Sequence, residues 1–150
     1  MLRRAFTLVE LMIVVAIIGV LASIAVPNFL EMQYKAKRQE AFVNIDGINT
    51  TQVAYHAAND EFLTTDTGPG TPLGKKQRPW DSSLANWNLL GYAPDGAVRC
   101  NYKTTVFGGG DWFRTDATCD IDDDNQTMIV RYRSELSSTP GWDDLYPERY

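Results

Sequence analysis

The sequence has few of the residues on which catalysis and nucleic-acid binding depend. It holds one histidine, His56, and its 14 lysines and arginines are outnumbered by 19 aspartates and glutamates, which gives a net charge of −5. Such a chain lacks the broad basic surface that displaces counterions, so nucleic acid is not expected as a partner. No G-x-x-x-x-G-K-[ST] motif occurs. With no identifiable nucleophile or orienting acid for His56, we expect no enzyme.

Charge is almost absent from residues 6–27, FTLVELMIVVAIIGVLASIAVP. As a helix, the apolar stretch up to Val26 would extend about 32 Å, enough to cross the roughly 30 Å hydrocarbon core of a bilayer. Its one ionisable residue is Glu10. A carboxylate in hydrocarbon costs at least about 2.5 kcal/mol, and no cation lies one helical turn away on the C-terminal side. Glu10 therefore requires a partner from elsewhere.

Residues 3–11, Arg-Arg-Ala-Phe-Thr-Leu-Val-Glu-Leu, resemble the processing motif of type IV pilins and pseudopilins. The resemblance implies that a prepilin peptidase cuts between Ala5 and Phe6 and methylates the new amino group of Phe6. It also implies that Glu10 pairs with the Phe6 amine of a neighbouring subunit, which supplies the missing cation. Ala5 stands where the family usually has Gly. An ordinary secretory signal is less favoured, because its cleavage site follows an apolar segment of about 7 to 15 residues.

Five segments are expected along the chain. Residues 1–5 are a cleaved leader, and residues 6–27 form a helix for the membrane or the filament core. Residues 28–59 continue as an amphipathic helix, residues 60–97 are an irregular connection rich in turn residues, and residues 98–150 hold a sheet and a polar tail. The predicted fold class is α+β, with a long N-terminal helix packed against a C-terminal antiparallel sheet, as in pilins.

The apolar face of the amphipathic half is predicted from Ala41, Ile45, Ile48 and Tyr55, with Phe42 and Val53 at its flanks.

Three strands are expected in the sheet. The alternation from Ala97 to Val106 predicts the first, and residues 112–119 and 127–133 predict the other two. The tail after residue 133 is polar but contains aromatic residues that indicate contact with the domain itself, a neighbouring subunit or another partner.

Two weak positions interrupt the apolar helix. Gly19 costs about 1 kcal/mol relative to alanine, and Pro27 lacks a backbone donor. They could simply kink a membrane helix. In pilins, similar residues bound a segment that loses helical order in the filament, and we favour the same behaviour here.

The two cysteines, Cys100 and Cys119, both lie in the polar half, and their spacing excludes a C-x-x-C site. A membrane-targeting start places that half outside the cytoplasm, where thiols oxidise. We therefore expect a disulfide between them, worth about 3 kcal/mol on the chain-entropy account.

Two charged clusters have open interpretations. Asp120, Asp122 and Asp124 have the alternate spacing of a calcium loop, but Asn125 and Arg131 replace the Gly and Glu of an EF-hand. An acidic turn is the favoured interpretation and calcium binding the alternative.

Lys75, Lys76 and Arg78 form a small basic patch. A solvated loop is favoured there over a contact site for DNA or an acidic surface polymer.

The resemblance implies a structural subunit, the major pilin in the first interpretation, of a type IV pilus used for adhesion or twitching motility. The subunit would wait in the inner membrane as a single-pass protein with its C-terminal part in the periplasm. It would then polymerise into an extracellular homo-oligomeric filament with a platform protein and a cytoplasmic ATPase. A minor pilin, a pseudopilin of type II secretion and a membrane-tethered periplasmic binding module that does not polymerise are the alternatives.

Overall fold

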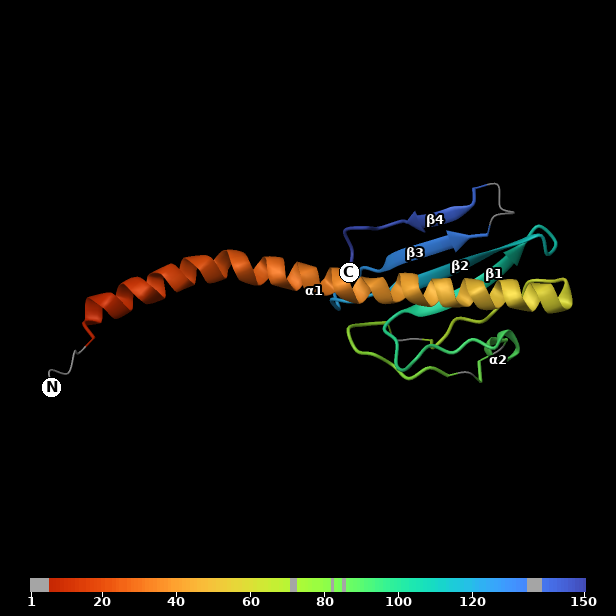
Figure 1. Ribbon diagram of the computed structural model, residues 1–150, viewed down its shortest axis with the longest axis horizontal. Coiled ribbons are helices and arrows are strands. Elements are labelled where there is room, and N and C mark those ends of the chain that lie inside the picture. Colours follow the sequence, from red (N-terminus) through yellow and green to blue (C-terminus); the bar gives the residue numbers. More distant parts are fainter. Residues whose placement is uncertain (1–5, 71–72, 82, 85, 135–138) are drawn as a thin grey trace. The chain divides into compact units, whose positions relative to one another are not determined.

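The computed structural model describes residues 6–70, 73–81, 83–84, 86–134 and 139–150, and the expected leader with Ala5 lies outside them. Its elements are α1 (Leu8–Asn59), α2 (Trp87–Leu90), β1 (Asn101–Phe107), β2 (Trp112–Cys119), β3 (Met128–Arg133) and β4 (Gly141–Asp144). The predicted α+β class is confirmed (Figure 1). The chain forms two compact units that divide between Lys35 and Ala36, within α1.

The first unit contains the apolar part of α1 and has no core of its own. All residues from Phe6 to Gln33 are exposed. A helix that is apolar all round is normally buried in a protein core or in a membrane. This part of α1 therefore lacks the cover that its sequence demands.

The second unit places the other half of α1 on one face of the sheet. Ala41, Ile45 and Ile48 are fully buried, whereas Val53 at the flank is 60% exposed. Hydrogen bonds join the helix to β1 and β2. Asn44 Nδ2 donates to the Tyr102 hydroxyl at 2.8 Å, and Thr115 Oγ1 donates to Asn49 Oδ1 at 3.1 Å.

The sheet is an antiparallel meander with the strand order β1-β2-β3-β4. Burial alternates along β2, where Phe113, Thr115 and Ala117 face α1. The expected start of the first strand at Ala97 is wrong, since β1 begins at Asn101. Val98 instead pairs with Arg78 of the preceding connection, through backbone hydrogen bonds of 2.7 and 2.8 Å.

The tail contributes a fourth strand that the sequence did not predict. Trp142 of β4 packs against Phe42 of α1 and Tyr132 of β3, with ring centroids 5.4 and 5.3 Å away. Arg38 of α1 donates to the Asp144 carboxylate and, at 2.7 Å, to the Pro147 carbonyl. The tail therefore contacts its own domain.

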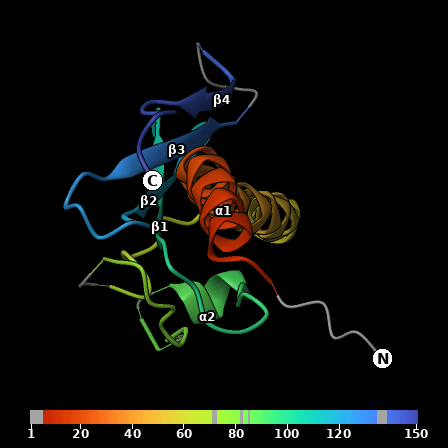
Figure 2. The same ribbon diagram turned by 90° about the vertical axis from the view of Figure 1, so that its left-hand side faces the viewer.

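The connection after α1 lies next to β1, at the edge of the sheet opposite to β4 (Figures 1 and 2). Gln52 holds its start by exchanging two hydrogen bonds with the Leu63 backbone, at 2.6 and 3.0 Å. Trp87 and Leu90 of α2 are buried, as expected for the later half of this segment. The irregular connection is thus fixed to the domain.

Replacing Ile48 by alanine should lower the free energy of unfolding by about 2 to 5 kcal/mol, because its fully buried side chain would leave a cavity. Val43→Ala is the matched control on the same helix, since Val43 is 69% exposed and should cost less than about 0.5 kcal/mol. Denaturant unfolding of the full chain in detergent micelles, followed by circular dichroism, measures both. Equal losses would contradict this packing of α1.

Candidate functional site

The exposed apolar segment is the first candidate site. Part of α1 is long and apolar enough to cross a membrane, and none of its apolar window is buried within the subunit. The core helix of a soluble protein would pass the same test of length and composition, but it would be covered. The segment therefore suits a bilayer or a bundle of like helices.

Glu10 lies at the start of this segment and closes a capping box with Thr7. Glu10 Oε2 accepts hydrogen bonds from Thr7 N at 2.8 Å and Thr7 Oγ1 at 2.7 Å, and Thr7 Oγ1 accepts one from Glu10 N at 3.2 Å. The reciprocal pattern satisfies free donors at the helix start. Sequence analysis missed the role of Thr7, although Thr-x-x-Glu before an apolar run is the signature of this cap.

The cap occupies only one side of the carboxylate. Among the described residues, Oε1 of Glu10 accepts no hydrogen bond and no cation pairs with the group. A carboxylate can accept about four hydrogen bonds. Glu10 is therefore held in a fixed position while retaining room for an external donor.

Gly19 and Pro27 lie within unbroken helix in the isolated chain. The missing amide of Pro27 leaves the Ser23 carbonyl without its usual partner four residues on. Ser23 Oγ donates to the Val20 carbonyl at 2.7 Å, and no side chain approaches Gly19. The predicted loss of helical order concerns the filament and stays a prediction.

A disulfide joins Cys100 to Cys119, next to the paired residues Asn101 and Thr118. Both cysteines are fully buried at the end of β2, where the acidic loop of residues 120–125 begins. The bond therefore anchors that loop to β1.

The acidic loop gathers three carboxylates, since ligand oxygens of Asp120, Asp122 and Asp124 lie within 4.8 Å of one another. Asp120 organises the turn by accepting hydrogen bonds from the backbone nitrogens of Asp123 and Asn125, at 2.9 and 3.2 Å. Asp122 Oδ1 is buried without a hydrogen-bond partner in the described part of the chain. Burial, and then the charge of Asp124, raises the pKa of Asp122 above its ordinary value. A bound cation would relieve both effects.

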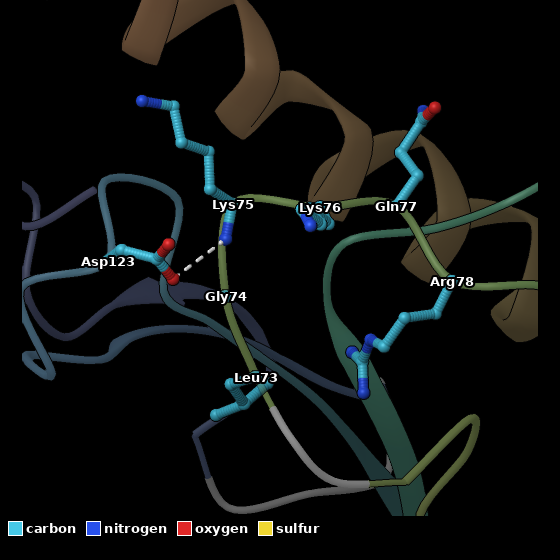
Figure 3. A pocket seen from close by; sticks show the side chains of 7 residues that line it. All are labelled: Leu73, Gly74, Lys75, Lys76, Gln77, Arg78 and Asp123. Carbon is cyan, nitrogen blue, oxygen red and sulfur yellow. Dashed lines mark hydrogen bonds between the residues drawn. The ribbon is translucent and has the colours of Figure 1, made fainter.

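The basic loop, residues 73–78, lines a pocket of about 360 Å³ together with Asp123 (Figure 3). The backbone nitrogen of Lys75 donates to Asp123 Oδ1 at 3.2 Å, which links this loop to the acidic loop. A side chain at Gly74 would place its Cβ 2.6 Å from the same oxygen. The two loops are therefore closely apposed.

Arg78 does not belong to the exposed basic patch that the sequence predicted. Its side chain points away from Lys75 and Gln77 (Figure 3). The guanidinium donates to the Gly70 carbonyl, to the Arg99 carbonyl at 2.9 Å and to Asn101 Oδ1 at 3.1 Å. Arg78 thus connects the loop to the sheet, and the patch is reduced to two lysines.

His56 packs against an aromatic side chain. Its ring stacks on Phe62 with 4.3 Å between centroids, near the end of α1. No hydrogen bond joins it to a hydroxyl, thiol or carboxylate within the described residues, so it matches no catalytic arrangement there.

Comparison with known proteins identifies the N-terminal segment. The family model of the prokaryotic N-terminal methylation motif matches residues 1–26. No solved structure matches the chain.

Relatives extend the similarity into the second unit. The chain is 36% identical to the type IV major pilin protein PilA of Myxococcus xanthus over 71% of its own length and 39% of that protein. It is 37% identical to the type II secretion system core protein G of Escherichia coli, over 60% of the chain and 61% of that protein. A fimbrial protein of Neisseria meningitidis is 35% identical over 46% of the chain and 41% of its own length. The chain therefore spans less than two thirds of each of these relatives.

Proposed function

Because this chain belongs to the type IV pilin and pseudopilin family, we propose that it is the major pilin of a type IV pilus, a structural subunit and not an enzyme. The observation that carries the proposal is the uncovered apolar part of α1, with a capped acid at its start. A subunit with such a surface is soluble only in a bilayer or among helices of the same kind. Both environments follow in turn during assembly.

The apolar segment first holds the subunit in the inner membrane with the sheet on the periplasmic side. It then leaves the lipid for a bundle of identical helices in an extracellular filament. Lipid and bundle are similarly apolar, so van der Waals packing and polar contacts between helices drive the transfer. A prepilin peptidase, an inner-membrane platform protein and a cytoplasmic ATPase are the partners of this step.

Glu10 sets the stagger between neighbouring helices. Once the leader is removed, Phe6 carries a cationic amine at the exposed start of the segment. Oε1 of Glu10 can accept a hydrogen bond from this amine on the next copy, while Oε2 keeps its hydrogen bonds to Thr7. Thr7 therefore positions the carboxylate, and a charge-assisted hydrogen bond between copies completes it.

The major pilin is favoured over two related roles. Similarity to both a major pilin and core proteins of type II secretion keeps the pseudopilin as the second candidate. Sheared surface filaments made chiefly of this chain would identify a major pilin, and filaments in which it is scarce would identify a minor one. An uncut, unassembled chain would instead indicate a membrane-tethered binding module.

Mass spectrometry of filaments sheared from cells should find N-methylated Phe6 as the terminus of the dominant subunit.

Glu10→Val should leave the chain in the membrane but reduce surface filaments at least about tenfold, because each interface loses a charge-assisted bond of about 1.5 to 3 kcal/mol. Glu31→Val is the control, since the ion pair that Glu31 forms within the described residues, with Lys35 at 2.6 Å, is exposed and contributes little. Normal filament yield from Glu10→Val would overturn the role of Glu10.

We also propose that residues from Gly19 to Pro27 lose helical order on assembly. The helix lacks one backbone hydrogen bond at Pro27, and no side chain packs against Gly19. Both features make helical order easier to lose in this segment. A helical reconstruction of the filament should show extended backbone there. Continuous helix from Leu8 to Asn59 in the filament would rule it out.

For the acidic loop, we propose that Asp120, Asp122 and Asp124 bind one calcium ion with the affinity of an extracellular module. The buried, unpaired Oδ1 of Asp122 supports this interpretation over a plain acidic turn. With a Kd of about 1 mM, 10 mM calcium should stabilise the full chain by about 1.4 kcal/mol.

Thermal unfolding in detergent micelles tests the calcium site. Calcium should raise the Tm of the wild type and of Asp95→Asn, which removes an exposed acid elsewhere. Asp122→Asn should abolish the rise. An unchanged Tm of the wild type in calcium would exclude the site.

A further inference from the structure

The face of the sheet that points away from α1 carries an excess of positive charge. Since Phe113, Thr115 and Ala117 of β2 are buried against the helix, the alternate residues of the strands lie on the opposite face. The charged residues of this basic sheet face are Lys103, Arg114, Asp116, Arg131, Arg133 and Asp143. Four of them, Lys103, Asp116, Arg131 and Asp143, lie opposite one another in a row across the four strands, and Arg114 and Arg133 form the next pair.

This face differs in sign from the rest of the molecule. Four cations and two acids give it a net charge of +2, whereas the remaining 10 cations and 17 acids of the chain give −7. Opposite charges that face each other across neighbouring strands stabilise a sheet, and like charges directly opposite destabilise it. Here Arg114 and Arg133 lie directly opposite each other, so like charges meet in one cross-strand pair.

The acids on this face hold the arginines in place without neutralising them. Asp116 accepts hydrogen bonds from Arg114 Nε at 2.8 Å and from Arg131 Nε at 2.6 Å, so one carboxylate serves two guanidinium groups. Asp143 pairs with Arg133 at 2.8 Å. The terminal nitrogens of Arg114 and Arg131 have no hydrogen-bond partner among the described residues. Their donors are thus preorganised for an external anion.

The basic sheet face remains accessible. The side chains of Arg114, Arg131 and Arg133 are 29%, 20% and 20% exposed. Lys103 of β1 is exposed and forms no ion pair in the described part of the chain. A row of cations that extends across neighbouring strands fits a polymer with repeated charges better than a single small ion.

We propose that the basic sheet face binds an anionic polysaccharide through its carboxylate groups. Guanidinium groups match the planar geometry of carboxylates, and neighbouring strands about 4.8 Å apart present several of them along one chain. The site requires only that the sheet lies outside the cytoplasm, so it holds whether or not the chain polymerises.

Single-stranded nucleic acid fits this face less well. Phe107 and Trp112 stack on each other with centroids 4.5 Å apart, and Arg114 lies over Phe107 at 5.1 Å. Ring faces occupied in this way offer little platform for base stacking.

Binding of labelled alginate to the full chain in nonionic detergent micelles tests the proposal. Lys103→Glu should weaken binding at least fivefold. Lys76→Glu makes the same charge change at an exposed lysine of the basic loop and should weaken it less than twofold. Arg131→Gln, which removes a guanidinium from the face, should also weaken binding. Lys103→Glu breaks no ion pair of the described chain, and an unchanged Tm would confirm its fold.

The proposal would be overturned by no binding of alginate at 50 mM salt, or by equal losses of affinity from Lys103→Glu and Lys76→Glu. Tighter binding of a thymidine oligonucleotide than of alginate would also overturn it, as would self-association of the chain that Lys103→Glu abolishes. The last would make the face an interface between copies. Neutral dextran should not bind, and binding of dextran equal to that of alginate would contradict recognition by charge.

Discussion

The rest of the structure depends on an apolar helix that its own subunit does not cover. From Phe6 to Gln33 the chain exposes its side chains on every side, and one carboxylate, Glu10, stands at the start. Because exposed apolar area is costly in water, this segment must be covered either by lipid or by other helices. Within the subunit, Thr7 holds the Glu10 carboxylate in one position through two hydrogen bonds, so the acid is already placed before any partner contacts it.

The second unit is held together by contacts of its own. Its core joins α1 to the sheet through Ile45 and Ile48, the disulfide fixes the start of the acidic loop, and Arg38 ties the tail to the helix. These contacts all lie between Ala36 and Tyr150. None of these named contacts involves the apolar segment.

Sequence predicted the features that depend on local pattern, and it missed those that depend on distant residues meeting. The apolar run, the apolar stripe of α1 around Ile48 and two of the strands were predicted because the spacing of apolar residues within each segment is enough to indicate them. By contrast, β4 has only four residues and is held by Trp142, whose partners come from α1 and β3. The sequence placed Arg78 in an exposed patch, because nothing local indicates that its guanidinium donates to the carbonyl of Arg99. The basic sheet face combines residues from four strands and has no signature in any one of them.

Glu10 is proposed to take its counter-charge from the next copy of the chain. Filaments assembled from a mixture of subunits, half labelled with ¹⁵N and half with ¹³C, test it directly by solid-state NMR. A correlation between the ¹⁵N amine of Phe6 and the ¹³C carboxyl of Glu10 can arise in such a sample only between copies, and we predict that it is seen. Its absence from mixed filaments, with the same correlation present in uniformly labelled ones, would show that the carboxylate is satisfied within its own subunit and would contradict the claim.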